Sequence, residues 1–427
     1  MAKLHLFMNR ERLGEIDLLD NKGSMGLSYD PAWLEAKGFA VSPHLPPGAS
    51  QPDQVRRFLQ NLLPEGEFLE ELSISTACSK ANVFGLIAEI GAETAGALSF
   101  SPDDSADPPP TSFREIPLEE LTDRIAARKT VSIAMWDEKP RLSVAGVQAK
   151  LPVLIRPDGV MGFGEGDLAS THLLKLGRDP ELHLVVNEYL CMKLAAAAGL
   201  PVAGVTLERF GEPVLSVRRF DRQWREGKVE RLHLIDGCQM LDLSPNYKYE
   251  RPFGKNGHAA GLRTGASLPL LFTASRGVCS VPAAAIKGLL DWALFQLVIG
   301  NSDSHGKNIS FFVGRTGITL APAYDLLCLD LYDYDRDLAM AIGDCFDPVE
   351  VGTYQLAEMC EECGVSQRQA AKSLSTLCGK ILHALQAVHI PGATPEERDF
   401  AERIKTTITA RAERLQRFTK DLPKIEL

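Results

Sequence analysis

The nine residues 300–308 read GNSDSHGKN and separate two apolar runs, LDWALFQLVI at 290–299 and ISFFV at 309–313. The first run belongs to residues 281–300, which are apolar on all sides and are typical of a core helix. After Asn308, the runs ISFFV and ITLAPAYD flank the turn GRTG, a pattern that predicts a β-hairpin. Such a hairpin would return Asp325 to the side of Asp303 and Asn308. One site would then hold two carboxylates and an amide oxygen.

This set of groups suits phosphoryl transfer. In protein kinases a loop aspartate accepts or orients the hydroxyl proton, and an asparagine five positions later binds a metal ion. A second aspartate, after a hairpin, holds metal against the phosphates. Asp303 and Asn308 have the required spacing, and Asp325 follows the predicted hairpin. Magnesium suits such a site because it prefers oxygen ligands.

Further polar groups precede this loop in the order that phosphoryl transfer requires. Residues 143–150, SVAGVQAK, read as a turn between strands whose backbone N–H groups could contact phosphate oxygens. Lys150 and Lys175 could each supply a cation, and Glu188 lies on the next predicted helix, where a lysine-pairing glutamate belongs.

Each of these signals also has an ordinary structural interpretation. The lysines could lie on solvated strand faces and Glu188 on a solvated helix face. Asp325, before Leu326 and Leu327, could be a helix N-cap. The pattern Asp-x-His-x-x-Asn could be turn chemistry alone. Only the joint occurrence of the signals, in this order, favours a catalytic site.

The whole chain has the composition of an ordinary globular protein. With 427 residues the chain is longer than a single hydrophobic core usually supports. Its 45% hydrophobic and 24% charged residues predict that it folds. A formal net charge of −10 argues against a surface-wide footprint for nucleic acid or anionic membrane. We find no signal peptide and no uninterrupted apolar run that would span a bilayer, so we expect a cytoplasmic protein. Nine scattered cysteines fit reduced thiols, and the CEEC at 360–363 has no second pair with which to form a zinc site.

Local patterns predict the main elements and the domain boundaries. We expect a hairpin at 3–20, a helix that begins at 53 and stops at Pro64-Glu65-Gly66, strands within 141–160 and a strand at 171–176. We also expect a helix over 187–200 and, except around the motif 300–308, a mainly helical region after 280. Residues 101–112, SPDDSADPPPTS, predict a surface connection. The predicted domains are 1–105, 106–225 and 226–427.

Several segments together resemble the HipA family of bacterial toxin kinases. The matching segments are NLLPEG, FGLIAEIGAETAGALSF, SVAGVQAK, THLLKL, NEYLCMKLA, RRFDR at 218–222, IGNSDSHGKN and the AYD that ends the hairpin. The resemblance covers most of the chain. It implies an α+β, kinase-like fold, with an N-terminal α/β lobe and a mainly helical C-terminal domain.

The resemblance also implies roles for individual residues. Asp303 would be the catalytic base, Asn308 and Asp325 would bind Mg²⁺, and Lys175 would contact the phosphates of ATP. The other residues implied to contact the nucleotide are Ala145, Gly146, Val147, Gln148, Ala149 and Lys150 of a covering loop, Arg218, Arg219 and Phe220 of a hinge that receives adenine through backbone groups, and His305, Gly306 and Lys307.

Ser143 is the implied site of regulatory phosphorylation. A phosphate there adds about −1.5 to −2 charges, which would repel ATP phosphates and push the loop outward. Two positions depart from the pattern of the family: Arg218 stands where we expect glutamate, and Ala149 stands where we expect an acidic residue. Backbone recognition should tolerate the first change, whereas the second could alter nucleotide affinity.

The resemblance implies a serine/threonine kinase toxin that phosphorylates a protein of translation, with an aminoacyl-tRNA synthetase as the usual target class. A helix-turn-helix, HipB-like antitoxin would neutralise it and carry it to operator DNA as a corepressor. Two alternatives stay open. Asp303-x-His305-x-x-Asn308 also resembles the loop of phosphatidylinositol-type kinases, so a lipid or small alcohol could be the acceptor. A nucleotide-binding corepressor with little catalysis is the other.

Overall fold

The computed structural model describes residues 2–91, 93–102, 110–137, 139–141, 149–177 and 183–427. The chain divides into two compact units. Unit 1 comprises Met1–Arg178, Glu208–Ile235 and Phe312–Gly317, and unit 2 comprises Asp179–Leu207, Asp236–Phe311 and Ile318–Leu427. Both units mix distant parts of the chain. The three-domain division predicted from the sequence stays a prediction.

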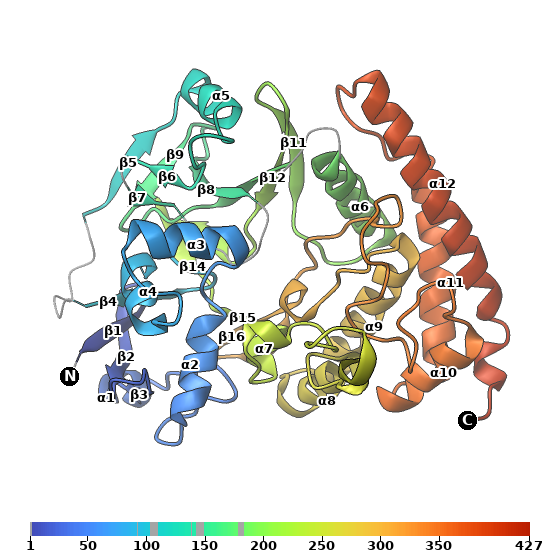
Figure 1. Ribbon diagram of the computed structural model, residues 1–427, viewed down its shortest axis with the longest axis horizontal. Coiled ribbons are helices and arrows are strands. Elements are labelled where there is room, and N and C mark those ends of the chain that lie inside the picture. The colour runs from blue at the N-terminus through green and yellow to red at the C-terminus, as the bar shows by residue number, and fades with distance from the viewer. Residues whose placement is uncertain (1, 92, 103–109, 138, 142–148, 178–182) are drawn as a thin grey trace. The chain divides into compact units, whose positions relative to one another are not determined.

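Unit 1 begins with a four-stranded sheet in the order β3-β2-β1-β4. Its strands are β1 (Lys3–Met8), β2 (Glu11–Leu18), β3 (Met25–Tyr29) and β4 (Leu98–Ser101), and Figure 1 shows helices α2, α3 and α4 beside them. The helices of this region are α1 (Pro31–Glu35), α2 (Pro52–Gln60), α3 (Gly66–Ser75) and α4 (Val83–Ile90). The antiparallel pairing of β1 with β2 confirms the predicted hairpin, and α2 confirms the predicted helix.

A six-stranded sheet follows in the order β11-β12-β10-β8-β9-β5. Its strands are β5 (Ser112–Glu115), β8 (Lys150–Ile155), β9 (Met161–Glu165), β10 (His172–Leu176), β11 (Val205–Arg209) and β12 (Pro213–Arg218). Helix α5 (Leu118–Ala126) contributes Leu121 and Ile125 to the core beneath this sheet. Two short hairpins, β6 (Met135–Trp136) with β7 (Lys139–Pro140) and β13 (Arg222–Arg225) with β14 (Lys228–Arg231), complete the strands of the region. Strand β10 confirms the strand predicted at 171–176, and β8 confirms the second of the two strands predicted within 141–160. Most of the first of these strands, with the glycine turn, lies outside the described residues.

Side chains along β10 point alternately to the two faces of the sheet, and this determines the face on which Lys175 lies. Leu174 and Leu176 belong to the core, and neighbouring residues of a strand point to opposite faces. Lys175 therefore lies on the other face, where it stands directly opposite Lys150 of β8 in the antiparallel register. Two lysines thus share one face of the sheet, and Lys175 is 7% exposed.

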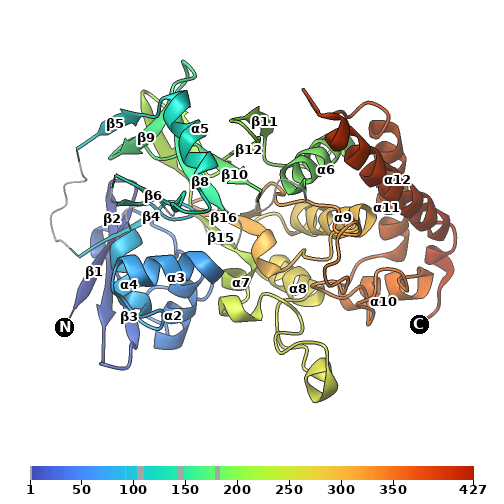
Figure 2. The same cartoon turned by 45° about the horizontal axis from the view of Figure 1, so that its top comes forward.

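Unit 2 is mainly helical. Its helices are α6 (Leu184–Ala198), α7 (Gly237–Met240), α8 (Leu268–Val278), α9 (Pro282–Ile299), α10 (Thr353–Glu362), α11 (Gln367–Ala384) and α12 (Pro395–Phe418), with 3₁₀ turns at Pro245–Tyr247, Gly257–Gly261, Gly306–Asn308 and Leu422–Lys424. Figures 1 and 2 both show α11 and α12 side by side. Helix α6 ends at Gly199 in the left-handed conformation (φ +86°), which glycine adopts without strain, and confirms the predicted helix.

Helix α9 is the predicted core helix. By length and composition it could cross a membrane, and it is the one helix that passes this test among the residues described. However, 61% of it is buried inside the protein. Its residues pack on α8, α11 and α12, as expected for a helix that is apolar on all sides.

Strands β16 (Ser310–Gly314) and β17 (Gly317–Leu320) follow α9 and confirm the predicted hairpin. They belong to a three-stranded sheet in the order β15-β16-β17, in which β15 covers Leu234–Asp236. The region after the hairpin differs from the prediction, because residues 321–352 contain no helix. Buried residues such as Leu326 and Ile342 hold this irregular segment against the unit by packing rather than by a helical repeat.

Candidate active site

The loop 301–308 begins where α9 ends. Gly300 ends the helix in the left-handed conformation (φ +74°), and a Cβ there would lie 3.0 Å from the Asp330 carboxylate. The buried side chain of Asn301 then braces the loop. Its Nδ2 donates to the Gln296 side chain (2.9 Å) and to the Asp325 carbonyl (3.3 Å), while its Oδ1 accepts from the Asp303 amide (3.2 Å). Asn301 thereby joins the backbone of Asp303 to that of Asp325.

Asp303 is the exposed residue in this loop, and residues 304–308 after it are buried. Its Oδ1 accepts a hydrogen bond of 2.7 Å from the phenol of Tyr249. Its backbone carbonyl accepts 2.9 Å from Nδ2 of Asn308. Since the amide nitrogen of Asn308 is used in this way, the opposite amide oxygen is the group that it can offer to a metal ion.

Asp325 lies where the predicted hairpin was expected to place it. Asn301 ties its backbone to the loop of Asp303, as the hairpin prediction requires. The backbone at Asp325 is left-handed (φ +59°), an uncommon conformation for a residue other than glycine. No helix begins after Asp325, so the alternative interpretation as a helix N-cap is wrong. Strained backbone of this kind is concentrated at functional sites.

Three further loop residues, His305, Gly306 and Lys307, face inward. Nδ1 of His305 accepts from the Lys307 amide (3.3 Å), and its ring meets the edge of Tyr249 at 5.2 Å between centroids. The amide of Gly306 donates to the Lys248 carbonyl (2.9 Å), and a Cβ at Gly306 would lie 2.6 Å from Ala266. These residues hold the loop in place.

The ammonium of Lys307 lies 2.6 Å from the carboxylate of Asp236, and both side chains are largely buried. Asp236 also caps α7 by accepting from the Gln239 amide (2.8 Å). A buried charge needs such a partner, because an isolated one would be strongly destabilising. Lys307 therefore has a structural contact here, and its place in a nucleotide site stays a prediction.

The other predicted site residues lie in both units. Lys150 and Lys175 belong to unit 1, as do Arg218, Arg219 and Phe220, whereas Glu188 belongs to unit 2. Glu188 is 1% exposed, so the interpretation of this residue as part of a solvated helix face is wrong. Its predicted pairing with a lysine stays a prediction. Ser143 and the loop residues 145–148 lie outside the described residues, while Ala149 packs on the core of the sheet.

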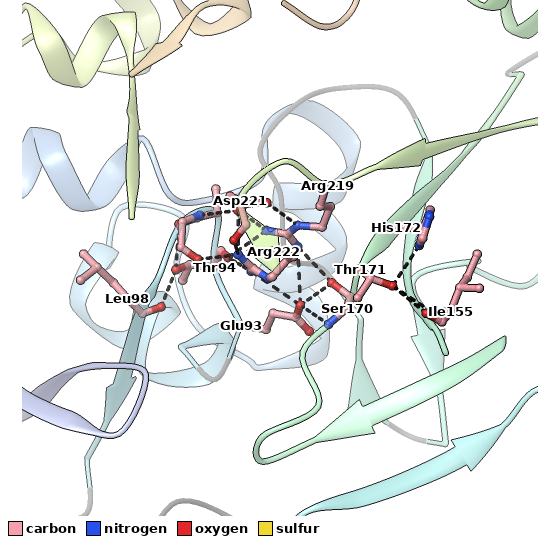
Figure 3. Close-up of polar contacts among 12 residues, drawn as sticks. Glu93, Thr94, Leu98, Ile155, Ser170, Thr171, His172, Arg219, Asp221 and Arg222 are labelled. Atoms are coloured by element: carbon pink, nitrogen blue, oxygen red, sulfur yellow. Dashed lines mark hydrogen bonds and ion pairs between the residues drawn. The ribbon is translucent and has the colours of Figure 1, made fainter. Parts of the chain in front are cut away.

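An ion cluster holds the predicted hinge, residues 218–220. We call it the Glu93 cluster; it comprises the partly exposed Glu93 and the buried residues Ser170, Arg219, Asp221 and Arg222. Figure 3 shows both guanidinium groups reaching the carboxylate of Asp221. Burial raises the pKa of Glu93, but the charges of Arg231, Arg219 and Arg222 outweigh it and lower the pKa below its usual value. Burial is also the main reason why the pKa of Arg222 falls to about 9.

Sequence reasoning missed Tyr249, Asn301, Asp236 and Glu93. Asn301 stands two residues before Asp303, a spacing typical of an Asx turn, so a local signal existed. No local signal could identify the others, because Tyr249 is 54 residues from Asp303 and Asp236 is 71 residues from Lys307. Among the residues described, no group of three or more His, Cys, Asp or Glu side chains could hold a metal ion. None of the nine cysteines, including Cys360 and Cys363, forms a disulfide bond.

Comparison with known proteins places this chain in a family. The model described as HipA N-terminal domain matches residues 4–101, and the model described as HipA-like C-terminal domain matches residues 142–385. The serine/threonine-protein kinase toxin HipA of Shewanella oneidensis is 38% identical over 431 residues, which cover 99% of this chain and 98% of that protein. A protein of Sinorhizobium fredii named as a kinase, Y4mE, is 32% identical, with 86% of this chain and 88% of that protein covered.

A solved structure gives the same result. The structure of the Shewanella oneidensis toxin–antitoxin system HipA, HipB and operator DNA has a chain that superposes with a TM-score of 0.91, at 38% identity, and the match covers 99% of this chain and 100% of that chain. The predicted kinase-like α+β fold is confirmed. Since the matches include both the N-terminal sheet and the loop of Asp303, the chain belongs to the HipA family of serine/threonine-protein kinases.

Proposed function

We propose that this chain is a toxin kinase that transfers the γ-phosphoryl group of ATP to a serine or threonine hydroxyl of a translation protein, with an aminoacyl-tRNA synthetase as the target class. The observation that carries the proposal is the arrangement around Asp303. Asp303 presents an exposed carboxylate, and the five residues that follow it in the loop are buried. Within the loop, the side chain of Asn308 donates to the backbone carbonyl of Asp303. The side chain of Asn301 connects the loop to the backbone of Asp325.

In this proposal Asp303 orients the attacking hydroxyl and receives its proton. The hydroxyl oxygen forms a bond to the γ-phosphorus, the bond to the β–γ bridging oxygen breaks, and ADP leaves. Tyr249 donates to Oδ1 of Asp303, which restrains the orientation of this carboxylate. Holding the carboxylate in one orientation reduces the entropic cost of reaching the transition state.

Asn308 and Asp325 fit a magnesium ion by their chemistry. An amide oxygen and a carboxylate are hard oxygen donors, and Mg²⁺ is held in proteins by few such ligands together with water and phosphate oxygens. The bound ion would supply charge neutralisation on the transferred phosphates. The left-handed backbone of Asp325 and its contact from Asn301 favour a fixed position for this carboxylate.

The nucleotide contacts come from unit 1 in this proposal. Lys175, with Lys150 opposite it on the same sheet face, would face the phosphates. The hinge 218–220 would receive adenine. Because the amide N–H of Arg219 already donates 2.9 Å to the Thr171 carbonyl, the hinge contact from Arg219 itself is restricted to its carbonyl oxygen. The loop 145–150 would cover the nucleotide, and phosphorylated Ser143 would repel its phosphates.

We further propose that a helix-turn-helix, HipB-like antitoxin neutralises this chain in the cytoplasm and that the complex represses its own operon. The related structure contains HipA, HipB and operator DNA, which supports this assembly. A net charge of −10 favours DNA binding through the antitoxin rather than by this chain alone, since neutralising phosphates requires basic groups.

The test is the intact mass of the purified protein after incubation with Mg-ATP, followed by peptide mapping. We expect the wild-type protein to gain a phosphate on Ser143 and Asp303→Ala to gain none, because the base is lost. Asp421→Asn is the matched control, since its carboxylate lies on the exposed C-terminal turn and is 66% exposed. It should behave as the wild type.

Each other outcome has a distinct meaning. Phosphate transfer to lipid or to a small alcohol, with none to protein, would support the other kinase class. Binding of ATP without any transfer, to the protein itself or to added protein, would favour a nucleotide-binding corepressor. Equal phosphorylation of Asp303→Ala and wild type would contradict the assigned base.

A further inference from the structure

The Glu93 cluster joins two parts of unit 1 that are more than 120 residues apart in the chain. Glu93 follows α4, while Arg219 and Arg222 follow β12. Asp221 accepts from Nε (3.0 Å) and Nη2 (2.8 Å) of Arg219 and from Nη1 of Arg222 (2.7 Å). The side chains of both arginines and of Asp221 are at most 6% exposed. Buried charges of this kind persist only where partners satisfy them.

The N-terminal side supplies several of these partners from its backbone. The Thr94 carbonyl accepts from Nη2 of Arg222 (2.9 Å) and of Arg219 (3.3 Å). The Gly96 carbonyl accepts from Nη1 of Arg222 (2.7 Å), and the Gly96 amide donates to Oδ2 of Asp221 (2.9 Å). The segment 93–96 therefore meets the hinge region with backbone groups at fixed positions.

Glu93 provides the acidic charge on this side. Its Oε1 accepts from the Ser170 amide (2.9 Å) and from the Ser170 hydroxyl, and lies 3.5 Å from Arg219 and 3.8 Å from Arg222. The Ser170 hydroxyl also accepts from Nη1 of Arg219 (3.0 Å). Glu93 and Ser170 thus complete the ring of contacts around the guanidinium of Arg219, as Figure 3 shows.

The backbone of residues 218–220 is therefore held by contacts with several other segments. The Arg219 amide is bonded to Thr171, its side chain is held by the Glu93 cluster, and the ring of Phe220 packs edge-on against Phe312 at 5.8 Å. A ligand that binds through the carbonyl or amide groups of this segment depends on their fixed orientation, because disorder there would add an entropic cost to binding.

We infer that the segment Glu93–Gly96 of the N-terminal subdomain positions the nucleotide hinge 218–220 and thereby sets the affinity of this kinase for ATP. The inference rests on the proposed function, in which that hinge receives adenine. Glu93 and Ser170 are positioning residues: they contact Arg219 and not the nucleotide. The N-terminal subdomain would then help to hold the nucleotide-binding hinge in position, although it would not itself contact the nucleotide.

The test is the dissociation constant of the nonhydrolysable analogue AMP-PNP, with Mg²⁺, measured by calorimetry on the full chain. Glu93→Gln keeps an oxygen for Ser170 and removes the charge that faces the two arginines. We expect its dissociation constant to rise about tenfold, as for the loss of a charge-assisted contact. At saturating ATP the rate of phosphoryl transfer by Glu93→Gln should equal that of the wild type. A smaller fraction of folded protein would instead lower this rate, so the comparison separates the two explanations.

Two further variants make the result decisive. Ser170→Ala removes a small hydroxyl from the same ring of contacts and should weaken binding in the same direction, by roughly threefold. Glu212→Gln is the matched control: it neutralises the partly buried ion pair with Arg128 (2.7 Å), which lies at the start of β12, at the other end from the hinge. It should bind AMP-PNP as the wild type does.

Unchanged binding in folded Glu93→Gln and Ser170→Ala would overturn the inference and leave the proposed function intact. If Glu93→Gln does not fold, Ser170→Ala decides, because a wild-type dissociation constant there contradicts the inference. An equal loss of binding in Glu212→Gln would show a general effect on unit 1 and would also overturn it. Failure of the folded wild type to bind AMP-PNP would overturn both the inference and the proposed function.

Discussion

At the scale of single residues, the proposed chemistry depends on how one carboxylate, that of Asp303, is held. Asp303 is exposed, and Tyr249 donates to one of its two oxygens at 2.7 Å. In the proposed mechanism this hydrogen bond restrains the carboxylate in one orientation. The aromatic ring is itself supported by His305 at its edge.

Replacement of Tyr249 by phenylalanine should therefore lower kcat with little change in KM for ATP. We expect a loss of about tenfold, which corresponds to one hydrogen bond to a charged acceptor. The measurement is the initial rate of phosphoryl transfer over a range of ATP concentrations. Tyr354→Phe removes a phenol from α10, where Tyr354 is 51% exposed, and should leave both constants unchanged. A wild-type kcat in Tyr249→Phe would show that the hydrogen bond does not orient the base.

At the scale of elements, the turn between α4 and β4 has a conformation that glycine alone fits. Gly96 is left-handed (φ +75°), and an added Cβ would lie 2.9 Å from the Leu234 amide nitrogen. The turn also carries both backbone contacts of Gly96 to the Glu93 cluster. A side chain here would have to move one of the segments that the turn connects.

Gly96→Ala should accordingly destabilise the protein by more than the backbone strain alone. Gly159→Ala is the matched control, since Gly159 is also left-handed (φ +87°) but has nothing within 4 Å of an added Cβ. We expect about 1 kcal/mol for Gly159→Ala from the left-handed conformation, and on the order of 3 kcal/mol for Gly96→Ala, where overpacking is added. Urea unfolding of the two variants measures the difference. Equal losses would mean that the Leu234 backbone moves aside without cost.

At the scale of the whole molecule, stability should depend on pH through histidines that are buried in neutral form. Burial lowers the pKa of His233 to about 4, and its contact with the Val41 carbonyl opposes this only in part. Nε2 of His233 lies 2.8 Å from that carbonyl, while Nδ1 has no hydrogen-bond partner in the part of the chain that the structure describes. Burial and the charge of Arg218 also lower the pKa of the half-buried His172 to about 4.

Between pH 4 and pH 6.5 the unfolded chain therefore binds more protons than the folded protein, so acid favours unfolding. Stability should be fully present above pH 6.5 and should decrease as the pH falls toward 4. For His233 the loss is on the order of 3 kcal/mol, at about 1.4 kcal/mol for each pKa unit. The thermal unfolding midpoint between pH 7 and pH 4.5 measures it. His233→Gln keeps a donor for Val41 and should reduce the slope; an unchanged slope would assign the effect to other groups.

The sequence by itself determined the family, many of the helices and strands outside residues 321–352, and the order of the candidate catalytic groups. Asp303, Asn308 and Asp325 could be named as candidates because the constraint is local: a fixed spacing of five residues and a hairpin of ordinary turn chemistry. The core helix α9 and the face of β10 that carries Lys175 could be predicted for the same reason, since they follow from the periodicity of neighbouring residues.

Only the tertiary structure decided which distant side chains complete these groups. Tyr249 reaches Asp303 across 54 residues, Asp236 reaches Lys307 across 71, and the amide of Gly96 reaches Asp221 across 125. No local sequence pattern identifies such pairs, because their residues come together only in the folded chain. There, each buried charge or polar group needs a hydrogen-bond partner. The tertiary structure also showed that Glu188 is buried, although its position on a helix gave no indication of that. Local spacing thus identifies the candidate reacting residues, and the tertiary structure shows which residues contact them.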